Sequence, residues 1–285
     1  MKAPAFDYAK PATLAEVFAL MDRYGDEARL LAGGQTLLAT LNMRLSEPAL
    51  LIDIGALEEL KGIAVEGEML RIGALATHSQ IEASALVATH APLLALAAPH
   101  IAHRAIRNLG TWGGSIAYGD PAAEWPTCLL ALDGVVVVRS TAGERRIAAR
   151  DFYTDLYTTA LAEGELITAC EIPLRQADEV CAFNELARRH GDYAIVGLAL
   201  TARRVPAGLQ QPRLSFLGVG TTPLRAWRTE ALFGQTALAA ADLDRTIASL
   251  QDELSPLADL TNSAATKRHL ACVLARRLLS SALAD

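Results

Sequence analysis

Two glycine pairs constrain the fold of this chain more than any other feature of its sequence. The first stretch, residues 30–37, reads LLAGGQTL, and the second, residues 108–115, reads NLGTWGGS. Glycine permits a positive φ and lets a ligand approach the backbone without meeting a Cβ, and consecutive free N–H groups in a turn form a concave anion site. Taken alone, one such stretch is more often a structural turn than a ligand site. Two of them, separated by residues 38–107, indicate one elongated, charged ligand that is held at two points.

Composition excludes several classes of protein. The 285 residues are 52% hydrophobic and 20% charged, which suffices for a sizeable core and favours two domains. The net charge is -6 and no Lys/Arg cluster forms a stripe, so nucleic acid is not an expected partner. The longest apolar stretches, such as 92–99 and 135–138, are too short for a membrane span, and the N-terminus has no apolar signal segment.

The four cysteines are scattered and form no C-x-x-C pattern. We therefore expect no iron–sulfur or zinc site on this chain. Free thiols are typical of a reducing compartment, and the expected location is the cytoplasm.

Residues 1–55 have the pattern of a small βαβ-like unit. Thr13 and Glu16 form a capping-box signature that opens a helix, and Gly25 is placed to end it. The expected elements that follow are a strand at 29–32, a helix at 35–41 and a buried strand at 50–54.

Residues 56–175 mix strands with alanine-rich helices. The Glu-Gly-Glu turn at 66–68 indicates a hairpin, Thr77 suits a helix cap, and Pro121 suits the first turn of a helix over 122–132. The other expected elements are strands at 63–65, 69–72, 135–139, 145–148 and 166–172, and one or two helices within 92–106.

A polar stretch at 176–179, just after Pro173, indicates a domain boundary near residue 176. We therefore expect domains 1–175 and 176–285, the first with subdomains at about 1–55 and 56–175. In the second domain we expect strands at 181–186, 194–202 and 213–219, and helices at 242–250 and 264–283.

Common catalytic and nucleotide-binding motifs are absent from the sequence. No H-E-x-x-H pattern accompanies His100 and His103, so we interpret them as solvated or core residues rather than metal ligands. The chain also lacks a G-x-S-x-G elbow, a P-loop and the G-x-G-x-x-G fingerprint of Rossmann-type NAD or FAD binding. We expect no metal site and no hydrolase-type acid or base.

Two further stretches each have two interpretations. Asp120 and Glu124 suit a helix start, as its cap and first-turn acid, but Glu124 could also accept hydrogen bonds from a ligand held by the preceding glycines. The run 188–194 is either a solvated turn between strands or a turn that places Tyr193 over a flat ring. The residues alone leave both alternatives open.

Three stretches together resemble a known family, the FAD-binding medium subunits of the molybdenum hydroxylases. They are 32–38 (AGGQTLL), 107–117 (RNLGTWGGSIA) and 120–126 (DPAAEWP). The medium subunit of aerobic carbon monoxide dehydrogenase is the most similar type, and the flavin domain of xanthine dehydrogenase is more distant. Matches at 171–173, 188–194 and 263–279 extend the resemblance over nearly the whole chain.

The resemblance implies an α+β fold and FAD as the cofactor. A two-subdomain FAD-binding domain of the vanillyl-alcohol-oxidase type would precede a C-terminal α+β domain with a small antiparallel sheet and helices. The first glycine stretch would cradle the pyrophosphate with backbone N–H groups, and the second would hold its other side. The implied cofactor-binding residues are Ala32, Gly33, Gly34, Gln35, Thr36, Thr111, Trp112, Gly113, Gly114, Ser115, Glu124, Ile167 (packed on the flavin) and Tyr193 (near the ring). Trp112 departs from the aliphatic residue that is usual in the family.

The resemblance also implies partner chains. A large subunit with a molybdenum–pterin cofactor would oxidise the substrate, and a small subunit with two [2Fe–2S] clusters would pass electrons to FAD on this chain, for delivery to an external acceptor. The expected assembly is a dimer of heterotrimers. The substrate, whether carbon monoxide, a purine, an N-heterocycle or an aldehyde, would be selected by the large subunit.

Two other functions remain compatible with the residues. A self-sufficient flavin-dependent oxidoreductase would turn over a simple donor without partners. A flavin-free assembly module would keep the fold and be colourless when purified.

Overall fold

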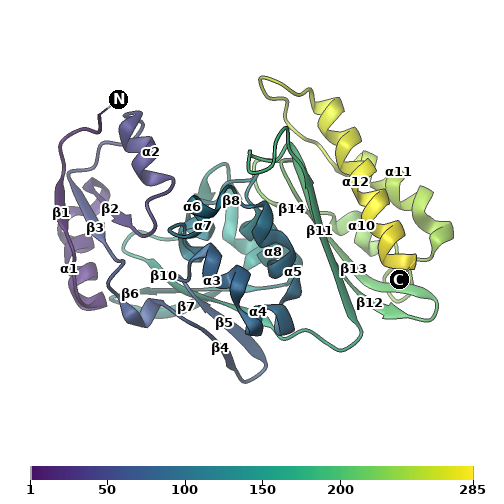
Figure 1. Cartoon of the computed structure of the whole chain (residues 1–285), viewed down its shortest axis with the longest axis horizontal. Helices are drawn as coiled ribbons and strands as arrows, with labels where there is room; N and C mark the ends of the chain where they lie inside the picture. The colour runs from purple at the N-terminus through teal and green to yellow at the C-terminus, as the bar shows by residue number, and fades with distance from the viewer. Residues whose placement is uncertain (1, 285) are drawn as a thin grey trace.

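Three sheets follow one another along the long axis of the molecule, in the order of the chain (Figure 1). The computed structural model describes residues 2–284. The three-stranded sheet lies at the N-terminal end, the five-stranded sheet in the middle, and the four-stranded sheet beside the C-terminal helices. This is the α+β architecture that the sequence predicted.

The N-terminal unit is a parallel sheet with strand order β1-β3-β2. Its elements are β1 (Asp7–Ala9), α1 (Leu14–Tyr24), η1 (Gly25–Glu27), β2 (Ala28–Leu31), α2 (Leu37–Asn42), β3 (Leu50–Asp53) and η2 (Glu58–Leu60). The predicted βαβ unit is confirmed, and β1 is an additional strand that the sequence pattern did not reveal. Thr13 Oγ1 accepts a hydrogen bond from the N–H of Glu16 at 3.3 Å, and α1 ends at Gly25, whose φ is +48°.

The middle sheet is antiparallel with strand order β4-β5-β10-β6-β7. Its strands are β4 (Ile63–Glu66), β5 (Met69–Gly73), β6 (Val135–Ser140), β7 (Gly143–Ala148) and β10 (Leu166–Pro173), with a separate ribbon of β8 (Tyr153–Asp155) and β9 (Thr158–Thr159). Two hairpins thus form its halves, and β10 returns to join them. The predicted strands of this region are confirmed.

Short helices fill the region between the middle and C-terminal sheets (Figure 1). They are α3 (His78–Ala83), α4 (Ala85–His90), α5 (Pro92–Ala97), η3 (Ala98–His100), α6 (Arg104–Arg107), α7 (Trp112–Tyr118), α8 (Glu124–Ala131) and α9 (Ala149–Phe152). Thr77 caps α3 in a complete capping box with Gln80, as its position predicted.

Two local predictions near the second glycine pair were wrong. The helix expected at 122–132 begins only at Glu124, because Asp120 Oδ1 accepts a hydrogen bond from the N–H of Ala122 at 2.8 Å and closes a turn instead of capping the helix. The pair Gly113 and Gly114 lies inside α7 rather than in a turn.

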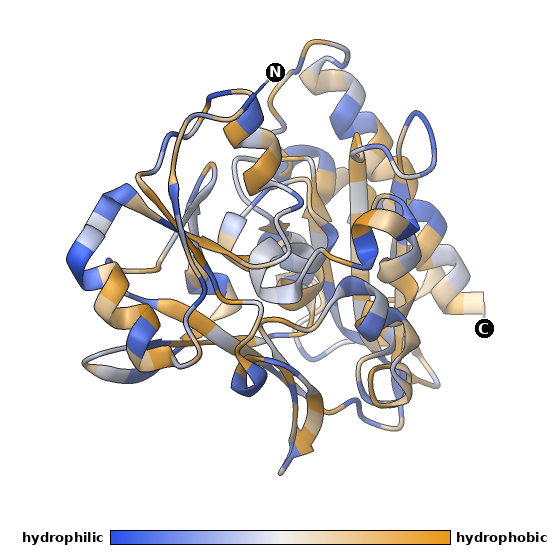
Figure 2. Cartoon of the chain, turned by 60° about the vertical axis from the view of Figure 1, so that its left-hand side comes forward, coloured by the Kyte–Doolittle hydropathy of each residue, from blue (hydrophilic) through white to orange (hydrophobic). Residues whose placement is uncertain are grey.

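The C-terminal sheet is antiparallel, with strand order β11-β12-β13-β14, and is covered on both faces. Its elements are β11 (Glu179–Leu186), β12 (Val196–Val205), β13 (Gly208–Leu217), β14 (Leu224–Arg225), α10 (Trp227–Ala231), η4 (Ala240–Asp242), α11 (Leu243–Glu253) and α12 (Ala264–Ala284). Phe183, Ala199 and Leu217 join the core of the middle region, whereas Leu198, Leu200 and Phe216 pack with the C-terminal helices. In Figure 2 hydrophobic residues accordingly follow the strands, and the surface helices carry both hydrophobic and hydrophilic residues.

An ion cluster joins the middle region to the C-terminal sheet. Asp133, in the turn between α8 and β6, forms an ion pair with Arg213 of β13 at 2.9 Å and accepts a hydrogen bond from Arg225 of β14. Thr201 Oγ1 donates to the carbonyl of Ala131 at 3.2 Å in the same interface. Among residues 2–284, no helix is both long and apolar enough to cross a membrane.

Candidate functional site

A cavity of about 660 Å³ lies where both glycine stretches meet the loop between β11 and β12. This volume falls within the range of small-molecule and cofactor pockets. The residues implied by the family resemblance that line it are Ala32, Gly33, Gly34, Gln35, Thr36, Thr111, Gly113, Gly114, Ser115, Glu124, Ile167 and Tyr193. Trp112 does not line the cavity and is fully buried behind it.

The two glycine stretches contact each other directly. A Cβ added at Gly33 would lie 2.0 Å from the carbonyl oxygen of Leu109 and 2.9 Å from Cα of Gly110. No side chain fits in that space, so glycine at position 33 is required by the contact between the stretches. Gly34 has a φ of +70°, which favours glycine for a second reason.

The first stretch offers free backbone donors. The N–H groups of Gly33, Gly34, Gln35 and Thr36 donate to no protein atom in the described part of the chain. The side chain of Gln35 donates to the carbonyl of Gly33 at 3.0 Å and holds the turn in shape. Four successive free N–H groups in the wall of a cavity form an anion site.

The backbone N–H groups of Trp112, Gly113 and Gly114 in the second stretch are already hydrogen-bonded to protein atoms. The N–H of Trp112 donates to the carbonyl of Ala76 and that of Gly113 to the carbonyl of Ala74, both at 2.8 Å. The N–H of Gly114 donates to Oγ1 of Thr111 at 3.2 Å. A Cβ at Gly113 would lie 2.6 Å from Cβ of Ala74, so this glycine permits close packing on the segment after β5.

A histidine that sequence reasoning missed forms part of the cavity wall. His78, the first residue of α3, accepts a hydrogen bond at Nδ1 from Nε1–H of Trp125 at 2.9 Å. Burial lowers the pKa of His78 to about 4, so the ring is neutral at pH 7 and Nε2 carries its proton. The capping box at Thr77 marks the start of α3, but no sequence signal placed His78 against Gly110.

Two acidic residues, Asp120 and Glu124, also line the cavity. Burial, followed by the charge of Glu185, raises the pKa of Glu124 to about 8. Burial also raises the pKa of Asp120. A protonated Glu124 can donate one hydrogen bond and accept others, so it can bind either kind of polar group on a ligand.

Apolar and aromatic side chains complete the cavity. Ile167 of β10 is buried in the wall, whereas Tyr193 is 77% exposed at the mouth. The loop that carries Tyr193 packs through Gly191, where a Cβ would lie 2.6 Å from Cε1 of His103. Tyr118 also lines the mouth, and its ring centroid lies 5.0 Å from that of Tyr157.

Comparison with known proteins assigns the chain to a family. Residues 4–175 match the model of the FAD binding domain in molybdopterin dehydrogenase, and residues 181–282 match the model of the CO dehydrogenase flavoprotein C-terminal domain. The chain is an FAD-binding subunit of the molybdenum hydroxylase family.

Relatives of this FAD-binding subunit cover nearly its whole length. It is 35% identical to the 6-hydroxypseudooxynicotine dehydrogenase complex subunit alpha of Paenarthrobacter nicotinovorans, over 99% of this chain and 96% of that protein. It is 32% identical to the carbon monoxide dehydrogenase medium chain of Afipia carboxidovorans, over 98% of this chain and 97% of that one. A solved structure of carbon monoxide dehydrogenase from Hydrogenophaga pseudoflava, which lacks the Mo-pyranopterin moiety, matches with a TM-score of 0.95 and 33% identity, over 99% of this chain and 98% of that one.

The residues of the cavity fit FAD. The free N–H groups of the first stretch suit a diphosphate, the glycine contact leaves room for it, and Ile167 with Tyr193 suits a flat ring. As an oxidoreductase subunit of this family, the chain binds FAD, while its relatives belong to multi-subunit enzymes.

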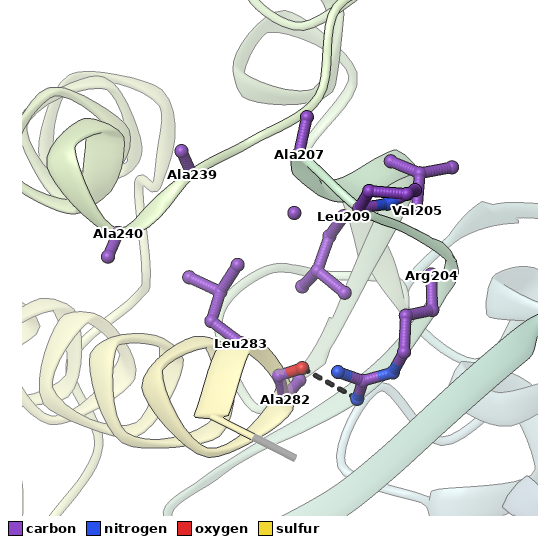
Figure 3. A pocket seen from close by; sticks show the side chains of 10 residues that line it. Arg204, Val205, Ala207, Leu209, Ala239, Ala240, Ala282 and Leu283 are labelled. Carbon is purple, nitrogen blue, oxygen red and sulfur yellow. Dashed lines mark hydrogen bonds between the residues drawn. The ribbon is translucent and has the colours of Figure 1, made fainter.

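A second hollow of about 520 Å³ lies between the β12–β13 turn and the end of α12 (Figure 3). Figure 3 shows Arg204 reaching across it, where Nη2 donates to the carbonyl of Ala282 at 2.9 Å. This arginine therefore satisfies a carbonyl at the end of α12. The lining is otherwise mostly small and apolar, so the hollow does not resemble the FAD cavity.

The metal and cysteine predictions can also be compared with the structure. Within residues 2–284, no group of three or more His, Cys, Asp or Glu side chains is arranged to hold a metal ion. His100 ends η3 and His103 precedes α6, so the two residues do not lie on one helix. Cys128, Cys170, Cys181 and Cys272 are free thiols.

Proposed function

We propose that this chain accepts electrons from the [2Fe–2S] clusters of a small partner subunit and passes them to an external acceptor. A large partner subunit with the molybdenum–pterin cofactor would oxidise the substrate. The observation that carries the proposal is the junction of both glycine stretches in one cavity with four free N–H groups. The names of the relatives, which are subunits and medium chains of dehydrogenases, support the division of labour.

The proposed contacts to FAD differ between the two stretches. Gly33, Gly34, Gln35 and Thr36 bind the diphosphate through their N–H groups. The second stretch lines the cavity with the Thr111 and Ser115 hydroxyls and with Gly113 and Gly114, and Ala32 adds a small side chain to the wall. Trp112 supports this wall from behind rather than touching the cofactor.

The ring end of the cofactor is bound by residues from three segments. Glu124 hydrogen-bonds polar groups, Ile167 packs against one side of the ring, and Tyr193 lies near it at the mouth. Bound FAD supplies a carrier that takes electrons singly and releases them in pairs. The chain contributes binding, orientation and the exclusion of water from the cavity.

The proposed organisation of the chain and its complex follows the same reasoning. Residues 1–175 form the FAD-binding domain, with subdomains at about 1–55 and 56–175, and residues 176–285 form the C-terminal domain. The ranges of the two family models, 4–175 and 181–282, support this division. We further propose a dimer of heterotrimers in the cytoplasm.

Amide NMR on the purified chain tests the cofactor assignment. Addition of FAD to the flavin-free protein should shift the N–H resonances of Gly33 and Gly34 strongly, and ADP should reproduce much of that shift because it carries the same diphosphate. The N–H of Gly113, which is bonded to Ala74, is the internal control and should move less. Equal or larger shifts at Gly113 would overturn the assignment of the diphosphate to the first stretch.

Co-purification tests the electron-transfer role. The chain should be isolated with two other subunits, with molybdenum and with iron, and alone it should not turn over a simple donor. Turnover by the isolated chain would instead support a self-sufficient flavoenzyme, and a colourless chain that fails to bind FAD would support an assembly module.

A further inference from the structure

His78 carries an imidazole N–H that no protein atom accepts. Its Nδ1 accepts the indole N–H of Trp125 at 2.9 Å, so the proton of the neutral ring resides on Nε2. The residue is only 6% exposed, and the ring also packs edge-on against the Trp125 ring, with 5.8 Å between the centroids. Nε2 donates to no protein atom within residues 2–284, yet it is not sealed inside the protein, so it faces the cavity that His78 lines. A donor that is fixed in one orientation and lacks an acceptor is suited to a ligand.

Gly110 places this donor next to the free backbone N–H groups of the first glycine stretch. A Cβ added at Gly110 would lie 2.6 Å from Nε2 of His78, so the imidazole packs directly against this glycine. From the other stretch, a Cβ added at Gly33 would lie 2.9 Å from Cα of Gly110. The backbone N–H of His78 also donates to the carbonyl of Gly110 at 3.0 Å. One glycine therefore contacts both the imidazole and the turn that carries the free N–H groups.

The other basic side chains of the cavity lining are engaged elsewhere. Within residues 2–284, Arg29 is the only arginine or lysine of the lining, and its Nη1 donates to two backbone carbonyls of its own segment at 2.7 and 2.8 Å. His103, the second histidine of the lining, packs against Gly191 in the loop between β11 and β12. His78 is thus the basic side chain that lies beside the first glycine stretch with a donor to spare.

We propose that Nε2–H of His78 donates a hydrogen bond to the diphosphate of FAD and so completes the anion site of the first glycine stretch. The inference rests on the proposed function, which assigns the diphosphate to that stretch. Trp125 is a positioning residue, because its indole N–H occupies Nδ1 and keeps the imidazole proton on Nε2. A hydrogen bond to a charged phosphate oxygen is stronger than one between two neutral groups.

Imidazole ¹⁵N NMR tests this contact on the flavin-free wild-type chain at pH 7. The Nε2 resonance of His78 should be that of a protonated nitrogen and should shift when ADP is added, whereas Nδ1, which is bonded to Trp125, should move less. Adenosine, which lacks the phosphates, should leave the Nε2 resonance in place. His269, exposed on α12, is the internal control. An Nε2 resonance that ignores ADP, or that responds equally to adenosine, would overturn the proposal.

Three substitutions separate the cofactor contact from support of the cavity wall. His78→Leu removes the donor to the diphosphate together with the acceptor for Trp125, and the dissociation constants of FAD and ADP should rise on the order of tenfold. His78→Gln should recover most of the affinity, because its amide oxygen can accept from Trp125 while its N–H groups face the cavity. Trp125→Phe breaks the same bond but keeps the imidazole, so it should weaken ADP binding less than His78→Leu does.

Two outcomes of the affinity measurements would count against the contact. Equal losses of ADP affinity in Trp125→Phe and His78→Leu would show that His78 only supports the wall, and wild-type affinity in folded His78→Leu would disprove the hydrogen bond. His269→Leu is the control and should bind ADP like wild type.

Failure of this inference is distinguishable from failure of the proposed function. If the wild-type chain binds neither FAD nor ADP, the proposed function is wrong. If ADP shifts the backbone N–H resonances of Gly33 and Gly34 while the imidazole of His78 does not respond, only the role of His78 is wrong.

Discussion

Nε1–H of Trp125 donates to Nδ1 of His78 across 2.9 Å, and this bond ties α8 to α3 at the wall of the FAD cavity. It also sets the tautomer of His78, because a nitrogen that accepts cannot carry the ring proton. The Trp125 ring contacts Trp112 at 5.3 Å between centroids, so the wall is supported by a continuous aromatic cluster. The histidine is therefore a neutral donor at a position where a charged ring would lose its partner.

The stability of the protein should depend on pH through His78. The folded pKa of about 4 lies below the ordinary value of 6.5, so the unfolded chain binds more protons between these values and stability falls as the pH is lowered through them. The contribution lost between pH 6.5 and 4 is about 3 kcal/mol. His78→Gln keeps an acceptor for Trp125 but does not titrate. As the pH falls from 6.5 to 4, the free energy of unfolding of wild type should therefore drop by about 3 kcal/mol relative to that of His78→Gln. Denaturant titrations across this pH range measure it, with exposed His269→Gln as control, and parallel curves for wild type and His78→Gln would contradict it.

Gly33→Ala should reduce FAD affinity more than it reduces stability. The added Cβ would meet the Leu109 carbonyl at 2.0 Å, so the two glycine stretches must separate and the free N–H groups must move. We expect the dissociation constant of FAD to rise by at least about 100-fold, which corresponds to roughly 3 kcal/mol. Fluorescence titration of flavin-free protein measures it. Gly220→Ala, at a glycine that does not line the cavity, should leave affinity unchanged, and tight binding by Gly33→Ala would show that the contact is dispensable.

Trp112→Ile should lower the free energy of unfolding without weakening FAD binding. Trp112 is fully buried and does not line the cavity, so a smaller side chain leaves a void of the kind that destabilises cores by about 2 kcal/mol. Part of this cost is offset, because Nε1–H of Trp112 is buried without a hydrogen-bond partner among the described residues, and isoleucine has no such donor to leave unpaired. The FAD dissociation constant should stay within about threefold of wild type. A folded variant that has lost FAD would instead place Trp112 in contact with the cofactor.

Asp133→Asn should weaken the contact between the middle region and the C-terminal sheet. The carboxylate pairs with Arg213 at 2.9 Å and with Arg225, whose side chain is almost fully buried and keeps Glu230 as its other partner. Asparagine tolerates the φ of +50° at this position, so the change tests charge rather than backbone strain. We expect a loss of about 1–3 kcal/mol in unfolding free energy.

Salt provides the control for the Asp133 prediction. The loss should shrink as salt is added, because the partly exposed carboxylate is screened. Asp151→Asn removes an exposed ion pair with Arg150 and should cost little at any salt concentration. Equal losses of unfolding free energy in the two variants would mean that the ion cluster at Asp133 stabilises the protein no more than an exposed ion pair does.

Features encoded in adjacent residues could be predicted from the sequence. The caps at Thr13 and Thr77, the stop at Gly25 and the hairpin at 66–68 depend on contacts within a few residues. The predicted helix start near Pro121 was wrong because of an interaction that is equally local. Asp120 competes for the N–H of Ala122 and closes a turn, a choice that the capping pattern does not distinguish.

The sequence by itself determined the residue types that an anion-binding cavity needs, because the free N–H groups and the absence of a Cβ belong to the local turn at Gly33 and Gly34. The tertiary structure alone decided which of the two glycine stretches keeps free backbone N–H groups. The N–H groups of Trp112 and Gly113 are used by Ala76 and Ala74, from a segment far away in the chain. The tertiary structure also decided the protonation of His78 and Glu124. Burial and charges from distant segments set the pKa of each group, and the adjacent residues in the sequence do not reveal them.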